Sequence, residues 1–529
     1  MFNLIEDAWI PAIRADGSTC QIAPWQLAET DNPVVELAAV RPDFQGALYQ
    51  FLIGLLQTVV APQDAEDWSD RYEDAPDSEQ LKARFSQLAP AFELFSETVQ
   101  AAFLQDLGLA EGEAKEIAGL LIEAPGGKTI KDNLDFFIKG GLIKQLCPAC
   151  AAQALFTLQT NAPSGGVGHR VGLRGGGPLT TLLRPVGPSS LWQKLWLNVL
   201  DTSTGFKPPL EPLSADIFPW LGPTRLSDKG GTATFPQDVH ALQMYWGMPR
   251  RIRLRPTEMA CQCDLCGQNS QIGVTQFITR NYGVNYDGAW MHPLTPYRVD
   301  PKKEKIPLSL KGQKGGLGYR HWLGLTLADS DNGDQAAKVV QDFYEHKTYA
   351  LSSKQQLQLW CFGYDMDNMK ARCWYEQTMP VLQLASEHTT QMQELVQYLV
   401  NAARESAKLL RHHVKQAWYR RPQDVSGDIS FIDAEFYHST SAHFYNLLND
   451  CLVAVQGQSL QRSEIFHVWH QQLQRTLARV FDQFTLNATP EDLDLKRVMQ
   501  ARASLFKSFN TNKQIKVIKP SKSTTKEAV

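Results

Sequence analysis

The 529-residue sequence lacks a hydrophobic run long enough to cross a membrane. Its most apolar stretch, residues 47–61, is interrupted by Gln50 and Gln57 and falls short of the roughly 20 residues that a spanning helix needs. We therefore interpret it as a buried helix. An excess of basic residues is also lacking, since the formal net charge is −4. A protein that coats nucleic acid without specificity is usually basic, so any contact with nucleic acid must be local.

Motifs of common catalytic sites are absent as well. The sequence contains no Gly-Xaa-Ser-Xaa-Gly motif, no His-Glu-Xaa-Xaa-His motif and no phosphate-binding loop. Asp365 and Asp367 could hold the metal of a nuclease, but no third carboxylate or histidine follows nearby, and aspartates at a loop tip usually serve turn chemistry. The sequence thus favours a protein that is not an enzyme, with a metal-dependent nuclease as an alternative.

Four of the nine cysteines form two Cys-Xaa-Xaa-Cys pairs, Cys147/Cys150 and Cys263/Cys266. With no signal peptide evident, we expect a reducing, cytoplasmic environment in which such pairs bind metal. Four thiolates complete the tetrahedral shell of a structural zinc ion and leave no position for a reactive water. The pairs therefore predict structural Zn²⁺. Two alternatives stay open: buried free thiols, and a pairing in which Cys261 replaces Cys263.

Two glycine clusters follow the first cysteine pair, at residues 165–168 and 175–177. Neither cluster has the spacing of a Walker loop or of a dinucleotide-binding fingerprint. Glycine lets backbone amides approach a ligand closely, and Arg170 and Arg174 lie between the two clusters. Contact with phosphate or with a groove of nucleic acid is one interpretation, and a loop without a ligand is the other.

Hydrophobic periodicity divides the chain into three parts. Residues 1–380 carry short strand patterns with frequent glycine and proline, and they predict a mixed α/β domain that includes both cysteine pairs and the glycine clusters. Residues 381–510 repeat apolar side chains every three or four positions with short connections, which predicts a four-helix bundle. Residues 511–529 carry five lysines and no apolar pattern, so we predict a disordered basic tail. The fold class is α+β.

Several segments of the chain, taken together, resemble one protein family. They are FNLIEDAWIPAIR at the start, LCPACAAQALF, NAPSGGVGHRVGLRGGGPLTTLLR, CDLCGQ, DGAWMHPLTPY and GYDMDNMKARCWYE. These segments resemble the large CasA-type subunit of the type I-E CRISPR Cascade complex, an RNA-guided assembly for surveillance of DNA in antiviral defence. The resemblance extends over essentially the whole chain.

The resemblance implies a zinc-containing α/β domain, a terminal four-helix bundle and no catalytic activity. It implies a subunit that recognises the protospacer-adjacent motif in double-stranded DNA, starts duplex unwinding and helps to recruit the CRISPR helicase–nuclease. Guide RNA and the other Cascade subunits are further partners, and no membrane is involved. Because the guide RNA reads the target sequence, the protein needs only the degenerate code of the minor groove and a local basic track. A wedge at the duplex end costs roughly a few kcal/mol of unstacking, which pairing with the guide offsets.

The resemblance also assigns residues in this sequence. Those matched to DNA-binding loops, namely a glycine loop, a lysine finger and a wedge loop, are Gly165, Gly166, Val167, Gly168, Arg280, Asn281, Asn368, Met369 and Lys370. Arg170 is a further DNA-binding candidate because its charge lies beside the glycine loop. A loop matched to residues 136–146, here called the partner loop, contains Phe136 and Lys139 and is expected to contact the guide RNA or a neighbouring subunit. The zinc ligands match Cys147, Cys150, Cys263 and Cys266.

At three positions this sequence departs from the family pattern. Val167 stands where a glycine is expected in the glycine loop, Met369 where a glutamine is expected in the wedge, and Asn281 where a lysine is expected in the finger. These changes leave the preferred motif bases open. A purely architectural zinc subunit that bridges other subunits and touches no DNA is the remaining alternative.

Overall fold

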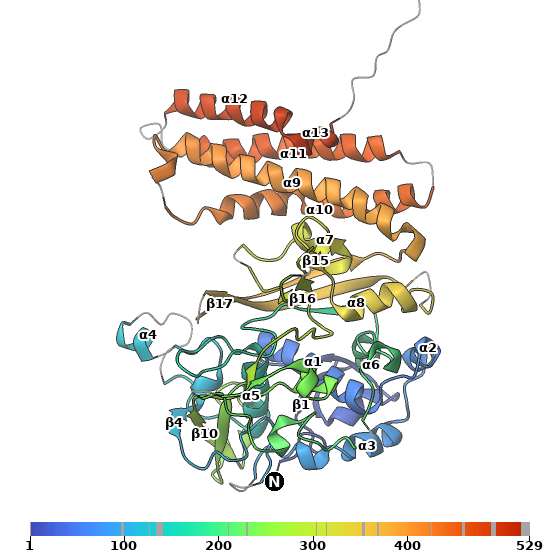
Figure 1. Ribbon diagram of the computed structural model, residues 1–529, viewed down its shortest axis with the longest axis vertical. Helices are drawn as coiled ribbons and strands as arrows, with labels where there is room; N and C mark the ends of the chain where they lie inside the picture. The colour runs from blue at the N-terminus through green and yellow to red at the C-terminus, as the bar shows by residue number, and fades with distance from the viewer. Residues whose placement is uncertain are drawn as a thin grey trace, which may run out of the picture. The chain divides into compact units, whose positions relative to one another are not determined.

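The structure is a computed structural model. It describes residues 2–96, 100–125, 127–133, 141–209, 211–228, 231–302, 304–313, 315–351, 355–367, 370–424, 426–457, 461–487 and 494–519. Two compact units emerge (Figure 1): the first is Met1–Gly312 with Ala336–Thr378, and the second is Gln313–Gln335 with Met379–Val529. Residues 313–335, which the sequence placed in the first domain, group with the C-terminal helices. Among the described helices, none has the length and apolar character to cross a membrane.

Helix α1 (Pro42–Val59) forms the centre of the first unit. Proline at its first position and Asp43 in its first turn favour a helix start here. Phe51 on this helix makes edge-to-face contacts with a set of aromatic rings from distant parts of the chain, Trp9, Phe92, Phe103, Phe156 and Trp246. Fifteen of its residues are buried, so the helix expected around residues 47–61 is confirmed as a core element.

Three three-stranded sheets of the first unit position the candidate site, with strand orders β2-β1-β3, β4-β10-β7 and β17-β16-β5. Their strands are β1 (Ile10–Arg14), β2 (Thr19–Ile22), β3 (Val34–Leu37), β4 (Glu113–Glu116), β5 (Thr180–Pro185), β7 (Arg251–Thr257), β10 (Gly273–Arg280), β16 (Leu357–Asp367) and β17 (Lys370–Val381). In the second of these sheets β10 pairs antiparallel with both neighbours. The sheet is therefore centred on the strand that leads from the second cysteine pair to Arg280.

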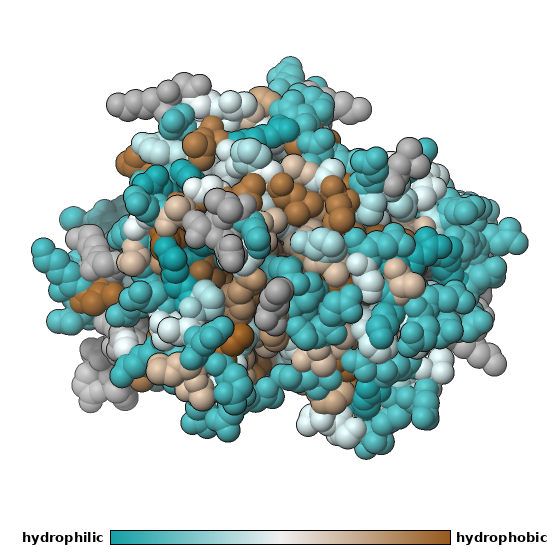
Figure 2. Space-filling view, turned by 90° about the horizontal axis from the view of Figure 1, so that it is seen from below, coloured by the Kyte–Doolittle hydropathy of each residue, from teal (hydrophilic) through white to brown (hydrophobic). Residues whose placement is uncertain are grey.

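Shorter elements complete the unit. Its other strands are β6 (Ala233–Thr234), β8 (Cys261–Gln262), β9 (Asn269–Ser270), β11 (Asn285–Tyr286), β12 (Tyr297–Arg298) and β13 (Leu308–Ser309). Its other helices are α2 (Ala65–Glu73), α3 (Ser78–Ser86), α4 (Gly127–Lys131), α5 (Pro148–Asn161), α6 (Leu191–Trp196) and α8 (Lys338–Asp342). The face seen in Figure 2 is largely hydrophilic, with apolar residues gathered toward its middle.

The second unit is helical. Its long helices are α9 (Thr389–Trp418), α10 (Ser430–Val455), α11 (Arg462–Thr485) and α12 (Leu495–Thr511), joined by α7 (Trp322–Thr326), α13 (Lys513–Val517) and the strands β14 (Ala328–Asp329) and β15 (Asp334–Gln335). Helix α9 packs against α10, α11 and α12 (Figure 1). Trp469 of α11 donates its indole N–H to the carbonyl of Leu399 over 2.9 Å. The helical character predicted from the periodicity is confirmed.

The prediction that residues 511–529 are disordered is wrong for the first part of this segment. Helix α12 continues to Thr511, and α13 follows after Asn512, whose side chain accepts from the amide of Gln514 over 2.9 Å. Ile515 and Ile518 are buried, so two apolar side chains three residues apart hold this turn of helix on the unit. Residues 520–529 of the segment lie outside the described residues.

Candidate metal centre and nucleic-acid interface

The first cysteine pair lies at the start of helix α5. Cys147 is the residue that caps the helix, Pro148 occupies the first helical position, and the Cys147 sulfur accepts from the amide of Cys150 over 3.5 Å. Proline is favoured here because its missing N–H would be unpaired in any case. The helix start therefore presents both sulfurs on the same side of its first turn.

The second pair lies in the tight connection between β8 and β9. The amide of Gly267 donates to the carbonyl of Cys263 over 2.9 Å, and the amide of Cys263 donates to the carbonyl of Gln268 over 2.9 Å. Gly267 has φ +72°, a left-handed conformation that a glycine adopts without strain. This turn folds Cys266 back toward Cys263.

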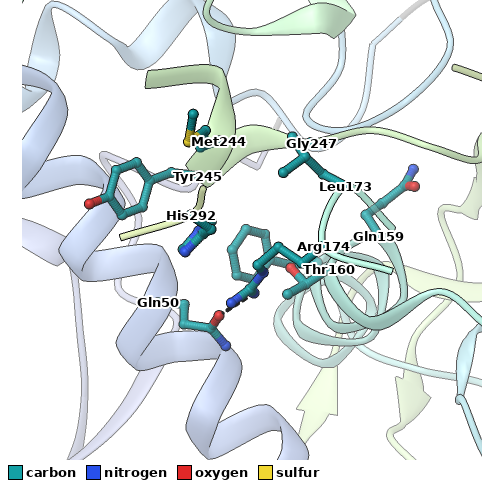
Figure 3. Close-up of a pocket in the computed structure, with 10 residues that line it drawn as sticks. Gln50, Gln159, Thr160, Leu173, Arg174, Met244, Tyr245, Gly247 and His292 are labelled. Atoms are coloured by element: carbon teal, nitrogen blue, oxygen red, sulfur yellow. Dashed lines mark hydrogen bonds between the residues drawn. The ribbon is translucent and has the colours of Figure 1, made fainter. Parts of the chain in front are cut away.

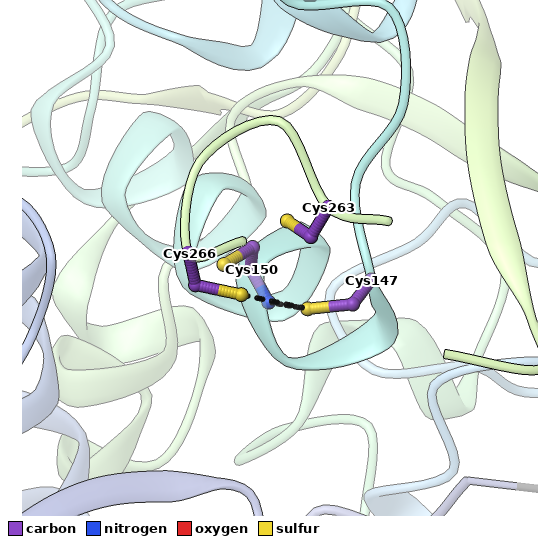
Figure 4. Close-up of side chains that lie close together, drawn as sticks. All are labelled: Cys147, Cys150, Cys263 and Cys266. Carbon is purple, nitrogen blue, oxygen red and sulfur yellow. Dashed lines mark hydrogen bonds between the residues drawn. The ribbon is translucent and has the colours of Figure 1, made fainter. Parts of the chain in front are cut away.

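The two pairs meet in one cluster (Figure 4). The sulfurs of Cys147, Cys150, Cys263 and Cys266 all lie within 4.8 Å of one another, and those of Cys147 and Cys266 are 3.7 Å apart. Thiolates bound to zinc at about 2.3 Å in a tetrahedron are separated by about 3.8 Å, so the donor set and spacing fit such an ion. Hydrogen bonds from the Cys147 and Cys150 thiols lower the pKa of Cys263 far below its usual range, and hydrogen bonds to Cys147 and Cys263 raise the pKa of Cys150. The first thiolate of the cluster therefore forms at Cys263.

The fifth cysteine in this region, Cys261, is not part of the cluster. Its sulfur donates to the carbonyl of Ile272 over 3.8 Å, and a Cβ added at Gly273 would lie 3.0 Å from that sulfur. The cluster therefore consists of the four cysteines with the regular spacing, and the alternative pairing through Cys261 is not formed.

Asp264, within the second pair, ties the cluster to the segment before α5. Its carboxylate accepts from the amides of Lys144 and Gln145 over 2.7 and 2.9 Å, and its own amide donates to the carbonyl of Gln145 over 3.1 Å. Leu146 and Val274 exchange two further backbone bonds of 3.0 and 2.9 Å. The cluster thus fixes residues 144–146, the end of the loop expected to contact a partner.

The first glycine cluster forms an exposed turn. The amide of His169 donates to the carbonyl of Gly166 over 3.2 Å, and Gly166 and Gly168 have φ +93° and +76°. Val167 at the tip is 76% exposed. Burial lowers the pKa of His169, and the charge of Arg250 lowers it further, so the histidine is neutral at pH 7 and the turn offers backbone groups rather than charge.

The turn is joined to the end of β10. The amide of Tyr282 donates to the carbonyl of Gly168 over 2.7 Å, and a Cβ added at Gly168 would lie 2.8 Å from the Cβ of Asn281. Arg280 and Asn281 are both exposed. Residues that the sequence separates by more than a hundred positions, the glycine turn and Arg280–Asn281, therefore lie side by side.

The two arginines between the glycine clusters interact with other parts of the protein. Arg170 donates from Nε to the hydroxyl of Ser227 over 2.7 Å and from Nη2 to the carbonyl of Ser227 over 2.6 Å. Arg174 is buried. Ser227 in turn donates to the carbonyl of Gly283 over 2.6 Å. Arg170 thus braces the glycine turn against the segment after β10.

The second glycine cluster contacts the hairpin of β16 and β17. A Cβ added at Gly177 would lie 2.7 Å from Cγ of Met366, and Gly312 forms a parallel bridge with Asp365. One segment, residues 161–178, therefore supports both the glycine turn and the base of the expected wedge. Lys370, the first residue of β17, is exposed. Asn368 and Met369, which connect β16 to β17 in the sequence, lie outside the described residues, and so do Phe136 and Lys139.

The acidic pair of the nuclease alternative is engaged by an arginine. Arg372 donates to both oxygens of the buried Asp365 over 3.0 and 2.7 Å and lies 3.5 Å from Asp367. Within the described ranges, the only group of side chains with metal-ligand geometry is the cysteine cluster. Asp365 and Asp367 therefore form ion pairs with Arg372 and serve the structure of the hairpin.

Three supporting residues escaped the sequence analysis: Asp264, Ser227 and Tyr282. Tyr282 has φ +64°, a conformation uncommon outside glycine, and no sequence pattern marks it. Asp264 was recognisable only as the first residue between two cysteines. The partners of Asp264 and Ser227 lie 56 to 120 residues away in the sequence.

Comparisons with known proteins agree with this arrangement. A model of the family described as CRISPR-associated protein Cse1 matches residues 3–480. Among solved structures, CasA of Thermus thermophilus has a TM-score of 0.68 at 18% identity, covering 96% of this chain and 99% of that one. Thermobifida fusca Cse1 has a TM-score of 0.67 at 16% identity, covering 96% and 98%. A chain of a CRISPR RNA-guided surveillance complex has a TM-score of 0.68 at 15% identity, covering 96% and 99%. The structures share the fold, and the family model spans most of the chain, so this chain belongs to the family of CRISPR-associated protein Cse1.

Proposed function

We propose that this chain is a non-catalytic subunit of an RNA-guided Cascade surveillance complex that recognises the protospacer-adjacent motif in double-stranded DNA. Its partners are the guide RNA, the other Cascade subunits, the target duplex and the CRISPR helicase–nuclease, which it helps to recruit. The supporting facts are its family and its structural similarity to a chain of a CRISPR RNA-guided surveillance complex. The process is antiviral defence in the cytoplasm.

One observation carries the proposal. The exposed turn at residues 165–168 is hydrogen-bonded to the segment that bears Arg280 and Asn281, so backbone groups and a cation share one edge of the first unit. The minor groove offers few distinguishing groups, and backbone amides with short polar side chains suffice to read it. Arg280 supplies a local phosphate contact in an otherwise acidic protein.

The hairpin of β16 and β17 is assigned to strand separation. Met369, which lies between the two strands in the sequence, would act as an apolar wedge between base pairs, and Asn368 and Lys370 would contact the separated strands. The support is the close approach of Gly177 to Met366, which puts the base of the hairpin against the same segment as the glycine turn. Insertion of an apolar side chain is how many proteins unstack a base step.

We assign Zn²⁺ to the cysteine cluster as a structural ion. Bound there, it would cross-link the start of α5 to the turn between β8 and β9 and contribute folding free energy. Through Asp264 the cluster also orients the loop of residues 136–146, where Phe136 and Lys139 would contact the guide RNA or a neighbouring subunit. We further assign α9–α12 as the four-helix bundle expected from the sequence, since α9 packs on the other three helices.

The test is target binding by the reconstituted complex, with and without this chain, on duplexes that differ only in the motif beside the guide-matched segment. We expect affinity to depend on the motif only when the chain is present. Val167→Asp should remove that dependence, because a carboxylate on this exposed turn repels the duplex, while the complex still assembles. Met369→Asp should do the same at the hairpin.

Val186→Asp is the matched control, because Val186 is also exposed (48%) and lies in the same unit, after β5. Motif dependence that persists without the chain would make it an architectural subunit. DNA cleavage by the purified chain in Mg²⁺, lost in Asp365→Ala, would instead support a nuclease.

A further inference from the structure

A polar pocket lies inside the first unit, beside the segment that carries both glycine clusters (Figure 3). Arg174, His292, Gln50 and Tyr245 are among the residues that line it. The cavity volume is about 20 Å³, and about 10–15 Å³ on the same measure is enough to hold one water molecule. The pocket therefore suits a ligand of one or two atoms. None of these residues has a role in the proposed recognition of DNA.

Among the residues that the structure describes, no carboxylate contacts the buried cation Arg174. The described partners of its side chain are neutral oxygens: Nη2 donates to Gln50 over 2.5 Å, and Nη1 donates to Thr180 and Thr295 over 3.1 and 2.9 Å. A guanidinium has five N–H groups, so Nε and one hydrogen of Nη2 have no partner in the part of the chain that the structure describes. Burial lowers the pKa of Arg174 to about 10, so the group is still charged at pH 7.

His292 adds a second donor to the same space. Its Nδ1 accepts from the amide of Leu294 over 3.1 Å, so the proton of the neutral ring lies on Nε2. The ring of Tyr245 packs edge-on against it, with centroids 5.2 Å apart, and closes one side of the pocket with apolar surface. Burial and the charge of Arg174 keep the pKa of His292 well below its usual range, so the ring does not add a competing charge.

We propose that this pocket binds one small inorganic anion of the size of chloride, held by the guanidinium of Arg174 and by Nε2 of His292. A buried charge without a counter-ion is costly, and a bound anion removes that cost. The anion would also stabilise the glycine-rich segment, because the carbonyl of Arg174 accepts from the hydroxyl of Ser309 over 2.5 Å and the amide of Gly172 donates to the carbonyl of Ala162 over 3.0 Å. The proposal does not depend on recognition of DNA.

Crystals of the full chain soaked in sodium bromide test the site directly, since bromide scatters anomalously and replaces chloride. We expect a bromide peak in contact with the Arg174 guanidinium and His292 Nε2. Bromide peaks at surface positions only, or ordered water alone in the pocket, would overturn the proposal.

Gln50→Glu gives an independent solution test, because it places a carboxylate where Gln50 already accepts from Arg174. In the wild type we expect the Tm to rise by about 1–2 °C for each tenfold of chloride above its Kd, against sodium gluconate at equal ionic strength. Gln50→Glu should lose this dependence because the carboxylate replaces the anion. Gln50→Met, which removes the acceptor without adding charge, should keep it. The same chloride dependence in all three proteins would count against the pocket.

Discussion

The amide of Tyr282 donates a hydrogen bond of 2.7 Å to the carbonyl of Gly168 and so joins the glycine turn to the end of β10. Both residues have positive φ, +64° and +76°. The contact therefore combines a left-handed glycine with a left-handed tyrosine, and the conformation of Tyr282 is uncommon outside glycine. It holds an exposed turn without charge beside the exposed cation Arg280, and the proposed recognition of a short DNA motif depends on this arrangement.

Gly168→Ala should disrupt that contact. An alanine Cβ would lie 2.8 Å from the Cβ of Asn281 and 3.0 Å from the amide nitrogen of Tyr282, and alanine at positive φ adds roughly 1 kcal/mol of backbone strain. Because the turn is at the surface, we expect a small loss of stability but a decrease of about tenfold or more in motif-dependent binding by the reconstituted complex. Both are measured on the same preparation, by thermal unfolding and by duplex titration.

Gly187→Ala is the control that separates the effect of backbone strain from the effect of losing the contact with β10. Gly187 also has a positive φ, +90°, but an added Cβ would meet no atom within 4 Å. This variant should share the small loss of stability and bind the duplex like the wild type. Equal binding losses in the two variants would mean that the contact between the turn and β10 is not the relevant feature.

Loss of the zinc ion that we assign to the cysteine cluster should destabilise the first unit. Cys150→Ser replaces one of four sulfurs that lie within 4.8 Å of one another, and a structural zinc site that loses a thiolate loses folding free energy with it. We expect about one Zn²⁺ per wild-type chain by elemental analysis, much less in Cys150→Ser, and a lower Tm. Cys20→Ser is the control, because Cys20 is a half-buried thiol outside the cluster. The assignment would be refuted if the wild-type chain held no metal and had the same Tm as Cys150→Ser.

Asp264→Ala should loosen the end of the partner loop without releasing metal. The carboxylate accepts from the amides of Lys144 and Gln145, so we expect faster hydrogen exchange at these two positions, with unchanged metal content and weaker assembly into the complex. Asp16→Ala serves as the control, since its carboxylate accepts from the amide of Ser18 over 2.8 Å in the turn between β1 and β2. Unchanged exchange at residues 144–145 would show that backbone bonds alone hold the segment.

Local pattern was enough to predict helix α1, the long helices of the second unit and the cysteine cluster, whereas the helices expected in residues 90–124 are replaced by β4 and short 3-10 turns. In α9 the buried residues Leu395, Leu399 and Leu410 follow the helical period, and the regular spacing of the cysteines singled out the four sulfurs that meet. Both signals are short-range, since each residue is defined by neighbours within a few positions.

Long-range partners could not be predicted. Arg170 was expected at phosphate because of the neighbouring glycines, yet it donates to Ser227, 57 residues away. The basic composition after residue 510 indicated disorder, whereas burial of Ile515 and Ile518 decides the structure there. In both cases the structure depends on which distant residues pack against the segment. No short-range sequence pattern identifies those residues.

Acid should destabilise the protein through His292. Its folded pKa lies well below the unfolded value of about 6.5, because burial and the charge of Arg174 disfavour the imidazolium. The stabilising contribution of the neutral ring is complete above pH 6.5 and is lost as the pH falls through the window below it, since only the unfolded state takes up the proton. One such proton corresponds to about 1.4 kcal/mol per pH unit. Between pH 6.5 and 5, the slope of the unfolding free energy against pH, measured by denaturant unfolding, should therefore be smaller in His292→Asn than in the wild type by about that amount.

Other histidines with lowered pKa, such as His240, contribute equally to both proteins and cancel in the difference. An unchanged slope would mean that His292 takes up its proton in the folded state as readily as in the unfolded one.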